Sequence, residues 1–191
     1  MPASSRSIAF ATGNHGKVLE ARFILSAFGI RPCVLKGKGT EVQASTVSTV
    51  AACSAREASR RYGRALIVED AGLFVDVLGG FPGPFSSYAF QTIGIPGLLR
   101  LLQNESLRTA SFKSAVAYCE PLGEPVVFDG LVAGRILEAP AGSGGFGFDP
   151  VFLPGGEKKS MAQMTLAEKC KVSHRGEAMR RFASWFTRDE G

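Results

Sequence analysis

The first seventy residues constrain the fold most, because short apolar runs alternate there with amphipathic helical patterns. Apolar runs bounded by turn residues are typical of buried strands, whereas apolar residues three or four positions apart are typical of helices. Alternating strands and helices predict a parallel portion of an α/β sheet, with catalytic groups at strand ends. The predicted strands are 7–12, 33–35 and 65–69, and the predicted helices are 17–28 and a helix that Ser45 or Thr46 caps and that reaches about residue 61.

Each predicted helix carries an apolar stripe that we expect to face the core. Gly29 marks the end of the first helix, because glycine is the usual residue after a helix C-terminus. The expected stripes are Leu19, Phe23 and Ala27 in the first helix, Val47, Val50, Ala51, Ser54 and Ala58 in the second, and Met179, Phe182, Ala183 and Phe186 in the last.

The second half of the chain changes character. Residues 79–84 have the composition of a turn, and 109–120 and 125–136 are long strand candidates around a second turn, which predicts an antiparallel hairpin. A glycine-rich loop at 139–149, a strand at 151–153, a capping box from Thr165 to Glu168 and a helix at 175–186 follow. We therefore expect a mixed sheet within one domain, residues 1–191, because no repeat or linker divides the chain.

Composition limits the classes of protein. Hydrophobic residues make up 45% and charged residues 20% of 191, close to the globular average. No apolar run has the length of a signal peptide or reaches the roughly 20 residues that span a bilayer, so we expect a cytoplasmic protein with no membrane partner. The four cysteines are widely spaced, which argues against a zinc site or a disulfide framework.

The net charge of +5 and the pI near 9.2 raise the question of nucleic acid. The basic residues occur as scattered pairs at 60–61, 158–159 and 180–181, each near acidic residues, which is typical of solvated surface. We therefore expect no nucleic-acid partner. A net positive field still suits a polyanionic small molecule.

A short segment between the first strand and the first helix favours phosphate binding, because free N–H groups and the helix dipole attract anions there. Its spacing differs from that of the P-loop, which has four residues between its first glycine and its Gly-Lys pair, and Ser or Thr after the lysine. An asparagine cap behind a turn explains the same residues equally well. The segment is Thr12, Gly13, Asn14, His15, Gly16 and Lys17.

Two acidic residues, Glu69 and Asp70, follow an apolar strand, where carboxylates either cap a turn or hold a metal ion. One or two carboxylates and the substrate phosphates commonly hold Mg²⁺ in proteins. Asp70, together with Lys17 and a further acid such as Glu41, therefore indicates a site for Mg²⁺. The same carboxylate is suited to orient or deprotonate an attacking water. Metal and lysine would neutralise charge on the phosphoryl oxygens.

The glycine-rich loop contains aromatic residues, which a loop that is merely flexible does not need. An aromatic ring can stack on a nucleobase. The loop contains Phe146, Phe148 and Asp149. Downstream, residues 169–175 place polar groups before the last helix, where we expect a solvated cap with a surface histidine, His174.

Five ordered motifs resemble the inosine triphosphate pyrophosphatase family, whose members remove non-canonical purine nucleotides, and the likeness is strongest to archaeal members. The motifs are ATGNHGK at 11–17, EDAGL at 69–73, GGFPGP at 79–84, GFGFDP at 145–150 and SHR at 173–175. The resemblance implies an elongated α/β fold with a mixed sheet, two lobes around a substrate cleft, a homodimer, and hydrolysis of ITP, dITP and XTP to the monophosphate and pyrophosphate.

The resemblance also implies roles for residues. Asp70 and Glu41 would hold Mg²⁺, with Mn²⁺ as an alternative, and Asp70 would accept a proton from water while Lys17 assists. The nucleotide would contact Thr12, Gly13, Asn14, His15, Gly16, Lys17, Ala71, Phe146, Gly147, Phe148, Asp149, Lys169, His174 and Arg175.

Several positions depart from the family pattern: Ala71 replaces Ser or Thr, Phe148 replaces Tyr and Cys170 replaces Asn. Residues 161–164 read MAQM in place of FAEM, and the second helix lacks a lysine found in some relatives near Cys53 or Ser54. These departures leave the substrate range open. The alternatives are a pyrophosphatase for modified pyrimidine nucleotides, a nucleotide-binding module without catalysis, and a nucleic-acid binder suggested by the pI alone.

Overall fold

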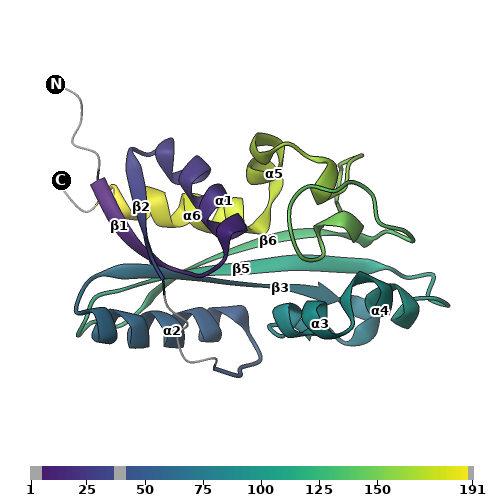
Figure 1. The fold of residues 1–191 in the computed structure, drawn as a ribbon, viewed down its shortest axis with the longest axis horizontal. Helices are drawn as coiled ribbons and strands as arrows, with labels where there is room; N and C mark the ends of the chain where they lie inside the picture. Colours follow the sequence, from purple (N-terminus) through teal and green to yellow (C-terminus); the bar gives the residue numbers. More distant parts are fainter. Residues whose placement is uncertain (1–5, 37–41, 189–191) are drawn as a thin grey trace.

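A seven-stranded sheet runs along the molecule in the computed structural model, which describes residues 6–36 and 42–188 (Figure 1). Its order is β2-β1-β3-β5-β6-β7, with β4 beside β3. β1 pairs in parallel with β2 and β3, and the other pairs are antiparallel, so the predicted mixed sheet is confirmed. The strands are β1 (Arg6–Ala11), β2 (Ile30–Leu35), β3 (Leu66–Val75), β4 (Pro82–Gly83), β5 (Thr109–Cys119), β6 (Val126–Ile136) and β7 (Phe152–Pro154).

Helices cover the sheet from both sides and form the two lobes (Figure 1). α1 and α6 pack on one face and α2 on the other, while α3 and α4 lie beside the distal half of β3. The helices are α1 (His15–Ser26), α2 (Val47–Tyr62), α3 (Ser86–Thr92), α4 (Gly94–Leu101), α5 (Leu166–Val172) and α6 (His174–Phe186), with 3₁₀ turns at Asp76–Leu78, Asp149–Val151 and Met161–Gln163.

β3 presents alternate side chains to the two faces of the sheet, as a strand must. Ile67 packs with α1 and α6, and Glu69 contacts residues of the same two helices. Leu66, Val68 and Phe74 pack in the core beneath α2, which places Asp70 on that second face. Neighbouring acidic residues therefore point to opposite sides of the sheet.

β1 ends earlier than the strand beside it. It pairs with β3 only at Leu66 and Ile67, and β4 pairs with β3 only at Leu73 and Phe74. Within the described residues, the stretch 68–72 of β3 thus has a strand partner on the β5 side alone. This gap leaves backbone groups beside Glu69 and Asp70 available to side chains.

The prediction that a strand ends at residue 69 is wrong, because β3 continues to Val75. Glu69 and Asp70 therefore lie in the middle of a strand, and the strand end at the site belongs to β1. The apolar run predicts the first half of β3. Glu69 and Asp70 then interrupt the apolar pattern, so the second half of the strand was not predicted.

The predicted core stripe of the first helix is also wrong. Leu19 and Phe23 are 43% and 45% exposed, and Ala27 is exposed as well. The buried face consists of Val18, Glu20, Ala21, Ile24 and Leu25. Apolar residues occur at helical spacing on both sides of this helix, so periodicity does not separate them, and the buried Glu20 makes the core side read as more polar.

Most other predicted elements are confirmed, including the β5–β6 hairpin, the Thr46 cap of α2 and the Thr165–Glu168 capping box of α5. The α6 stripe is confirmed too, with Met179, Phe182 and Ala183 buried. α3 and α4 were not predicted. The four cysteines are free thiols, and no helix among the described residues could cross a bilayer.

Gly130 allows α6 to approach β6 closely. A Cβ at this position would overlap the carbonyl oxygen of His174 and lie 2.6 Å from the amide nitrogen of Ala178. We expect Gly130→Ala to lower the free energy of unfolding by about 1–3 kcal/mol, the usual effect of overpacking. Urea denaturation measures this, with Gly123→Ala as the control, because its Cβ would meet ordinary contacts at 3.4 Å and beyond. Equal stability of the two variants would show that the helix can shift.

Candidate active site

The segment between β1 and α1 forms a capped helix start. The Asn14 side chain accepts a hydrogen bond from the Lys17 amide at 3.2 Å, and Thr12 Oγ1 accepts one from the Asn14 amide at 3.1 Å. Gly13, Asn14 and His15 are exposed. The asparagine cap is therefore confirmed, and the helix start remains accessible to an anion.

Lys17 closes the gap in the sheet. Its amino group donates to the backbone carbonyl of Glu69 at 2.8 Å and lies 2.9 Å from Oε2 of the same residue. Because β1 has ended, this carbonyl lies at an open strand edge, where a buried acceptor needs a partner. Lys17 thus links the predicted phosphate segment to β3.

A buried ion cluster continues from this pair. Arg175 contacts Glu69 through Nε at 3.0 Å and Glu20 through Nη1 at 2.8 Å. Lys169 contacts Glu20 at 2.8 Å and Asp149 at 2.5 Å. The ion cluster, which joins α1, β3, α5, α6 and the turn at residue 149, consists of Lys17, Glu20, Glu69, Asp149, Lys169 and Arg175.

Opposite charges decide the ionisation of this cluster. Burial alone would raise the pKa of Glu69, but Arg175, Lys17 and a hydrogen bond from Ser114 hold that pKa at about 2. Burial would also raise the pKa of Glu20, but Arg175 and Lys169 lower it below its ordinary value. Both glutamates are therefore charged and matched to cations.

Asp70 has a different environment on the other face. Burial raises the pKa of its carboxyl group to about 6, although Lys17 acts in the opposite direction. The Ala71 amide donates to this carboxylate, while Oδ2 is buried and accepts no hydrogen bond within the described part of the chain. A buried carboxylate oxygen of this kind suits a cation or the proton of a water molecule.

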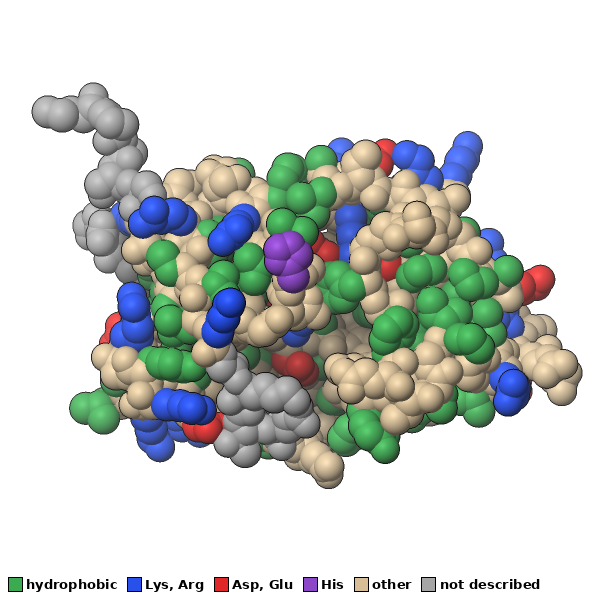
Figure 2. All heavy atoms as spheres, viewed as in Figure 1, with side chains coloured by type: hydrophobic (Ala, Val, Ile, Leu, Met, Phe, Trp, Pro, Cys, Tyr) green, Lys and Arg blue, Asp and Glu red, His purple; other side chains and the backbone are tan. Residues whose placement is uncertain are grey.

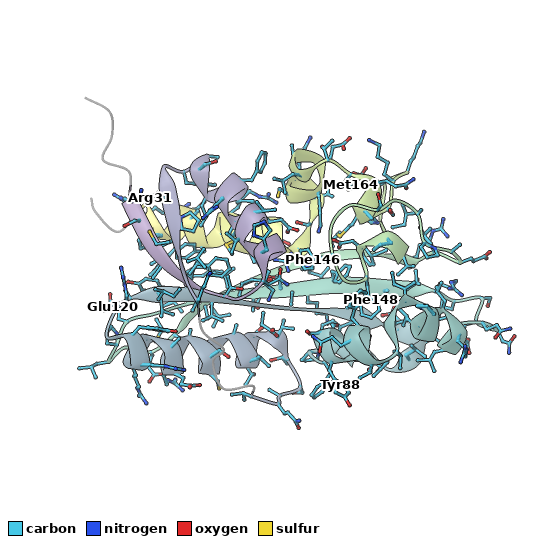
Figure 3. The ribbon with its side chains drawn as sticks, viewed as in Figure 1. Arg31, Tyr88, Glu120, Phe146, Phe148 and Met164 are labelled. Atoms are coloured by element: carbon cyan, nitrogen blue, oxygen red, sulfur yellow. The ribbon has the colours of Figure 1, made fainter. Side chains whose placement is uncertain are left out.

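Phe146 lies over the ion cluster, at the centre of Figure 3. Its ring centroid is 4.7 Å from Lys169 Nζ and 5.1 Å from Arg175 Cζ. Gly16 allows this approach, because a Cβ there would lie 2.6 Å from Cε1 of the ring. Gly147, with φ at 61°, turns the chain away after Phe146.

Asp149 anchors the same loop, because its carboxylate accepts from the Phe146 amide at 2.7 Å as well as from Lys169. Burial raises the pKa of Asp149, and Lys169 opposes this shift. Phe148 points elsewhere: it is 3% exposed and packs edge-on against Phe90 at 5.3 Å, in the lobe of α3 and α4 (Figure 3). Its predicted contact with a base stays a prediction.

The expected solvated cap before the last helix is wrong. His174 is 2% exposed, and its ring stacks on Phe112 with centroids 4.7 Å apart. Burial holds the pKa of His174 well below its usual value. Lys169 and Arg175 are also buried, at 4% and 2% exposure, because the ion cluster compensates their charge. Polar sequence alone cannot separate a solvated cap from a satisfied buried one.

Sequence reasoning missed Glu20 and Ser114, and gave Glu69 no role. Glu20 alone carried a signal, since it shares a helical face with Val18, Ala21 and Ile24. Ser114 Oγ donates to Glu69 at 2.5 Å from the neighbouring strand, a contact that only the β3–β5 register reveals.

The predicted metal pair is only partly described. Glu41 lies outside the described residues, so its position relative to Asp70 stays a prediction. Within 6–36 and 42–188, no group of three or more metal-ligating side chains is found. Asp70 is the described residue whose free carboxylate oxygen fits a cation.

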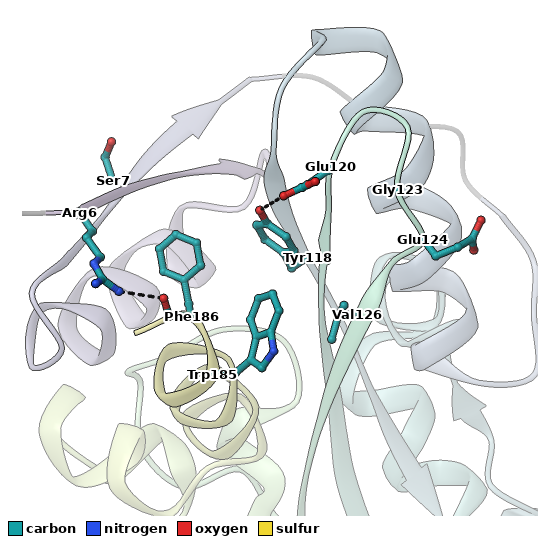
Figure 4. A pocket seen from close by; sticks show the side chains of 9 residues that line it. All are labelled: Arg6, Ser7, Tyr118, Glu120, Gly123, Glu124, Val126, Trp185 and Phe186. Carbon is teal, nitrogen blue, oxygen red and sulfur yellow. Dashed lines mark hydrogen bonds between the residues drawn. The ribbon is translucent and has the colours of Figure 1, made fainter. Parts of the chain in front are cut away.

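Figure 2 shows a hollow between the lobes, with acidic and basic side chains inside it. A second hollow of about 570 Å³ opens at the other end of β5, lined by Arg6, Tyr118, Glu120 and Trp185 among others (Figure 4). It contains none of the predicted site residues or of the ion cluster. The chemistry therefore points to the hollow between the lobes, because the buried charges and the free Asp70 oxygen lie at the gap in the sheet.

The fold and the site define a class of α/β proteins with a charged cleft between two lobes, and comparison with known proteins identifies the family. A sequence model of the Ham1 family matches residues 8–185, and the chain belongs to this family. It is 48% identical to the dITP/XTP pyrophosphatase of Methanopyrus kandleri, over 94% of this chain and 95% of the relative. The corresponding enzyme of Thermococcus kodakarensis is 47% identical, over 93% and 96%.

Solved structures agree with the fold. The HAM1 protein of Coxiella burnetii superposes with a TM-score of 0.82 at 28% identity, covering 95% of this chain and 98% of that one. The dITP/XTP pyrophosphatase of Mycobacterium abscessus gives 0.72 at 33% identity, covering 92% and 97%. The predicted family and the inosine triphosphatase-like fold, with archaeal relatives, are thereby confirmed.

The ion cluster predicts a pH-dependent stability. The pKa of Glu69 is about 2, below its ordinary 4.5, so its stabilising effect is complete above pH 4.5 and is lost as the pH falls toward 2. We expect Glu69→Gln to be less stable than the wild type at pH 7 by about 3–5 kcal/mol, and the difference to shrink between pH 4.5 and 3. Urea denaturation at each pH measures it. A difference that does not change with pH, or an equal loss in exposed Glu157→Gln, would contradict the assignment.

Proposed function

We propose that this chain hydrolyses non-canonical purine nucleoside triphosphates, such as dITP, ITP and XTP, to the monophosphate and pyrophosphate. Such an activity removes abnormal nucleotides from the nucleotide pool. The observation that carries the proposal is the ion cluster beside Asp70, at the gap in the sheet of a Ham1-family fold. The names of the relatives in Methanopyrus and Thermococcus support the same substrates.

The base would lie near Phe146, whose partly exposed ring provides a stacking surface. Arg175 uses Nη1 and Nε for Glu20 and Glu69, which leaves Nη2 as a donor for a bound base. Lys169 and Arg175 offer donors, and a 6-keto purine offers an acceptor where adenine offers a donor. Buried donors left unpaired by the wrong base support discrimination of up to about 10⁴–10⁵-fold.

The phosphates would lie at the start of α1, where Thr12 to Lys17 present backbone N–H groups and Lys17 adds its charge. Asp70 would accept a proton from the attacking water. The water oxygen bonds to the α-phosphorus, the bond to the bridging oxygen breaks, and pyrophosphate leaves. A carboxylate is suited to accept this proton, and burial raises the pKa of Asp70 above its ordinary value in the chain without a metal ion.

The residues fit a magnesium ion, since Asp70 Oδ2 is buried and without a partner among the described residues. Asp70 would hold the ion together with Glu41, and Mn²⁺ accepts the same oxygen ligands. The bound ion supplies positive charge to the phosphate oxygens.

The proposal includes a homodimer in the cytoplasm, formed by a chain that folds as one domain over residues 1–191 and binds neither nucleic acid nor membranes. The competing activities are hydrolysis of modified pyrimidine nucleotides and nucleotide binding without catalysis. Base preference and turnover separate these activities from the proposed one.

A release assay for pyrophosphate with Mg²⁺ tests the function across ITP, XTP, dITP, ATP, GTP and the pyrimidine triphosphates. We expect preference for the 6-keto, non-canonical purines and, in Asp70→Asn, a rate lower by at least about 100-fold, because a general base contributes about 10²–10⁴-fold. Inosine monophosphate should still bind the variant. Release of inorganic phosphate, or a pyrimidine preference, would refute the proposed activity.

Lys17→Ala should raise KM and lower kcat for ITP, because Lys17 faces both the phosphate segment and β3. Thermal unfolding checks that the fold is intact, since Glu69 keeps Arg175 and Ser114 as partners. Unchanged kinetic constants would mean that Lys17 serves only to close the strand edge.

A further inference from the structure

The cations of the ion cluster are already balanced. Lys17, Lys169 and Arg175 each lie within 3.0 Å of a carboxylate of Glu20, Glu69 or Asp149. Asp70 adds a further carboxylate. Every phosphate group of a nucleoside triphosphate carries negative charge, and the carboxylates of this cluster already offset its cations, so a cation outside the cluster would strengthen binding of the phosphate chain.

One lysine lies close to Asp70 but outside the cluster. In the β3–β5 register Asp70 is opposite Ala115, and Gly72 is opposite Lys113. Lys113 shares the α2 face with Asp70, because Ala115 and Ala117 of β5 pack in the core beneath α2. Diagonal neighbours on one face of a sheet are about 7–8 Å apart, within reach of long side chains.

Among the described residues, α2 does not extend over this part of the face. Ser48, in the first turn of α2, donates to Asp129, which lies in the same row of the sheet as Asp70 and Ala115. The next row, which contains Lys113, lies beyond the helix, and its member Leu131 is 52% exposed. The N-terminal end of α2 faces this region (Figure 1), and its dipole favours anions.

The amino group of Lys113 is directed across β3. It lies 4.4 Å from the ring centroid of Phe74, and this ring leans over Gly72, where a Cβ would lie 3.2 Å from its Cε2 atom. Its positive charge therefore lies over an aromatic ring beside Gly72, at the end of the gap, with no carboxylate partner among the described residues.

We propose that Lys113 binds the phosphate groups that leave as pyrophosphate, on the α2 face of the sheet. This inference deepens the proposed function and rests on it. Lys17 contacts β3 from the α1 side of the gap, and Lys113 from the other side, with Asp70 on the same face as Lys113. A phosphate chain that crosses the gap meets both lysines. Lys113 is thus a positioning residue for the leaving group.

The test compares Lys113→Ala with Lys113→Arg and with the control Lys158→Ala, an exposed lysine in the turn after β7. We expect Lys113→Ala to raise KM for ITP and the inhibition constant of inorganic pyrophosphate by about 10- to 100-fold, the loss of a charge-assisted contact. Inhibition by inosine monophosphate should change little, because it lacks these phosphates. Lys113→Arg should stay near the wild type, and Lys158→Ala should match it.

An unchanged inhibition constant for pyrophosphate in Lys113→Ala would overturn the inference. An equal loss of affinity for pyrophosphate and for inosine monophosphate, with a lower Tm, would also overturn the inference. Such a result would show that Lys113 has a structural role against Phe74. Calorimetric titration of wild type and variant with inorganic pyrophosphate needs no turnover. If the wild type binds pyrophosphate through Lys113 but hydrolyses no triphosphate, the proposed function fails and the site assignment stands.

Discussion

The buried ion cluster is the constraint on which the rest of the structure depends. Taking a single charged group out of water costs several kcal/mol even after relaxation, so each member requires its partners in place. Ser114 and the Phe146 amide provide further hydrogen bonds to its carboxylates. The cluster therefore holds α1, α5 and α6 in fixed positions over β3. A helix in another position would leave an unpaired charge in the interior. This cost favours a single arrangement of α1, α5 and α6.

β3 divides the site into two environments through strand alternation. Glu69 is fully ionised on the α1 and α6 face, where cations surround it, and Asp70 is poorly compensated on the α2 face. Adjacent residues of the chain thus carry one carboxylate with compensated charge and one without. The early end of β1 makes both accessible from the same gap, because a full-length neighbour would cover the strand edge and exclude Lys17 from the Glu69 carbonyl.

Sequence periodicity predicted the elements whose buried faces are mostly apolar, such as β1, the hairpin and the part of α6 around Met179 and Phe182. It failed where charge is buried: Glu20 made the true core face of α1 read as polar, and His174 and Lys169 read as solvated surface. Long-range register explains the other misses, since Ser114 reaches Glu69 only through β5. The motifs located Lys17, Phe146, Asp149 and Arg175, whereas their ion-pair partners required the tertiary structure.

Two departures from the family pattern, Cys170 and Phe148, fall at buried positions of packing, whereas Ala71 is half-buried beside Asp70. Cys170 is 2% exposed among the residues of the α1 and α6 core, and burial raises the pKa of its thiol to about 12, which leaves it neutral. Phe148 packs in the core of the other lobe, and Ala71 lies opposite Ser114. None of these side chains supplies a charge to the ion cluster, so their substitution leaves its ion pairs in place. Cores accept changes of shape more readily than changes of charge, so substitutions at these positions disturb the structure less than substitutions within the ion cluster.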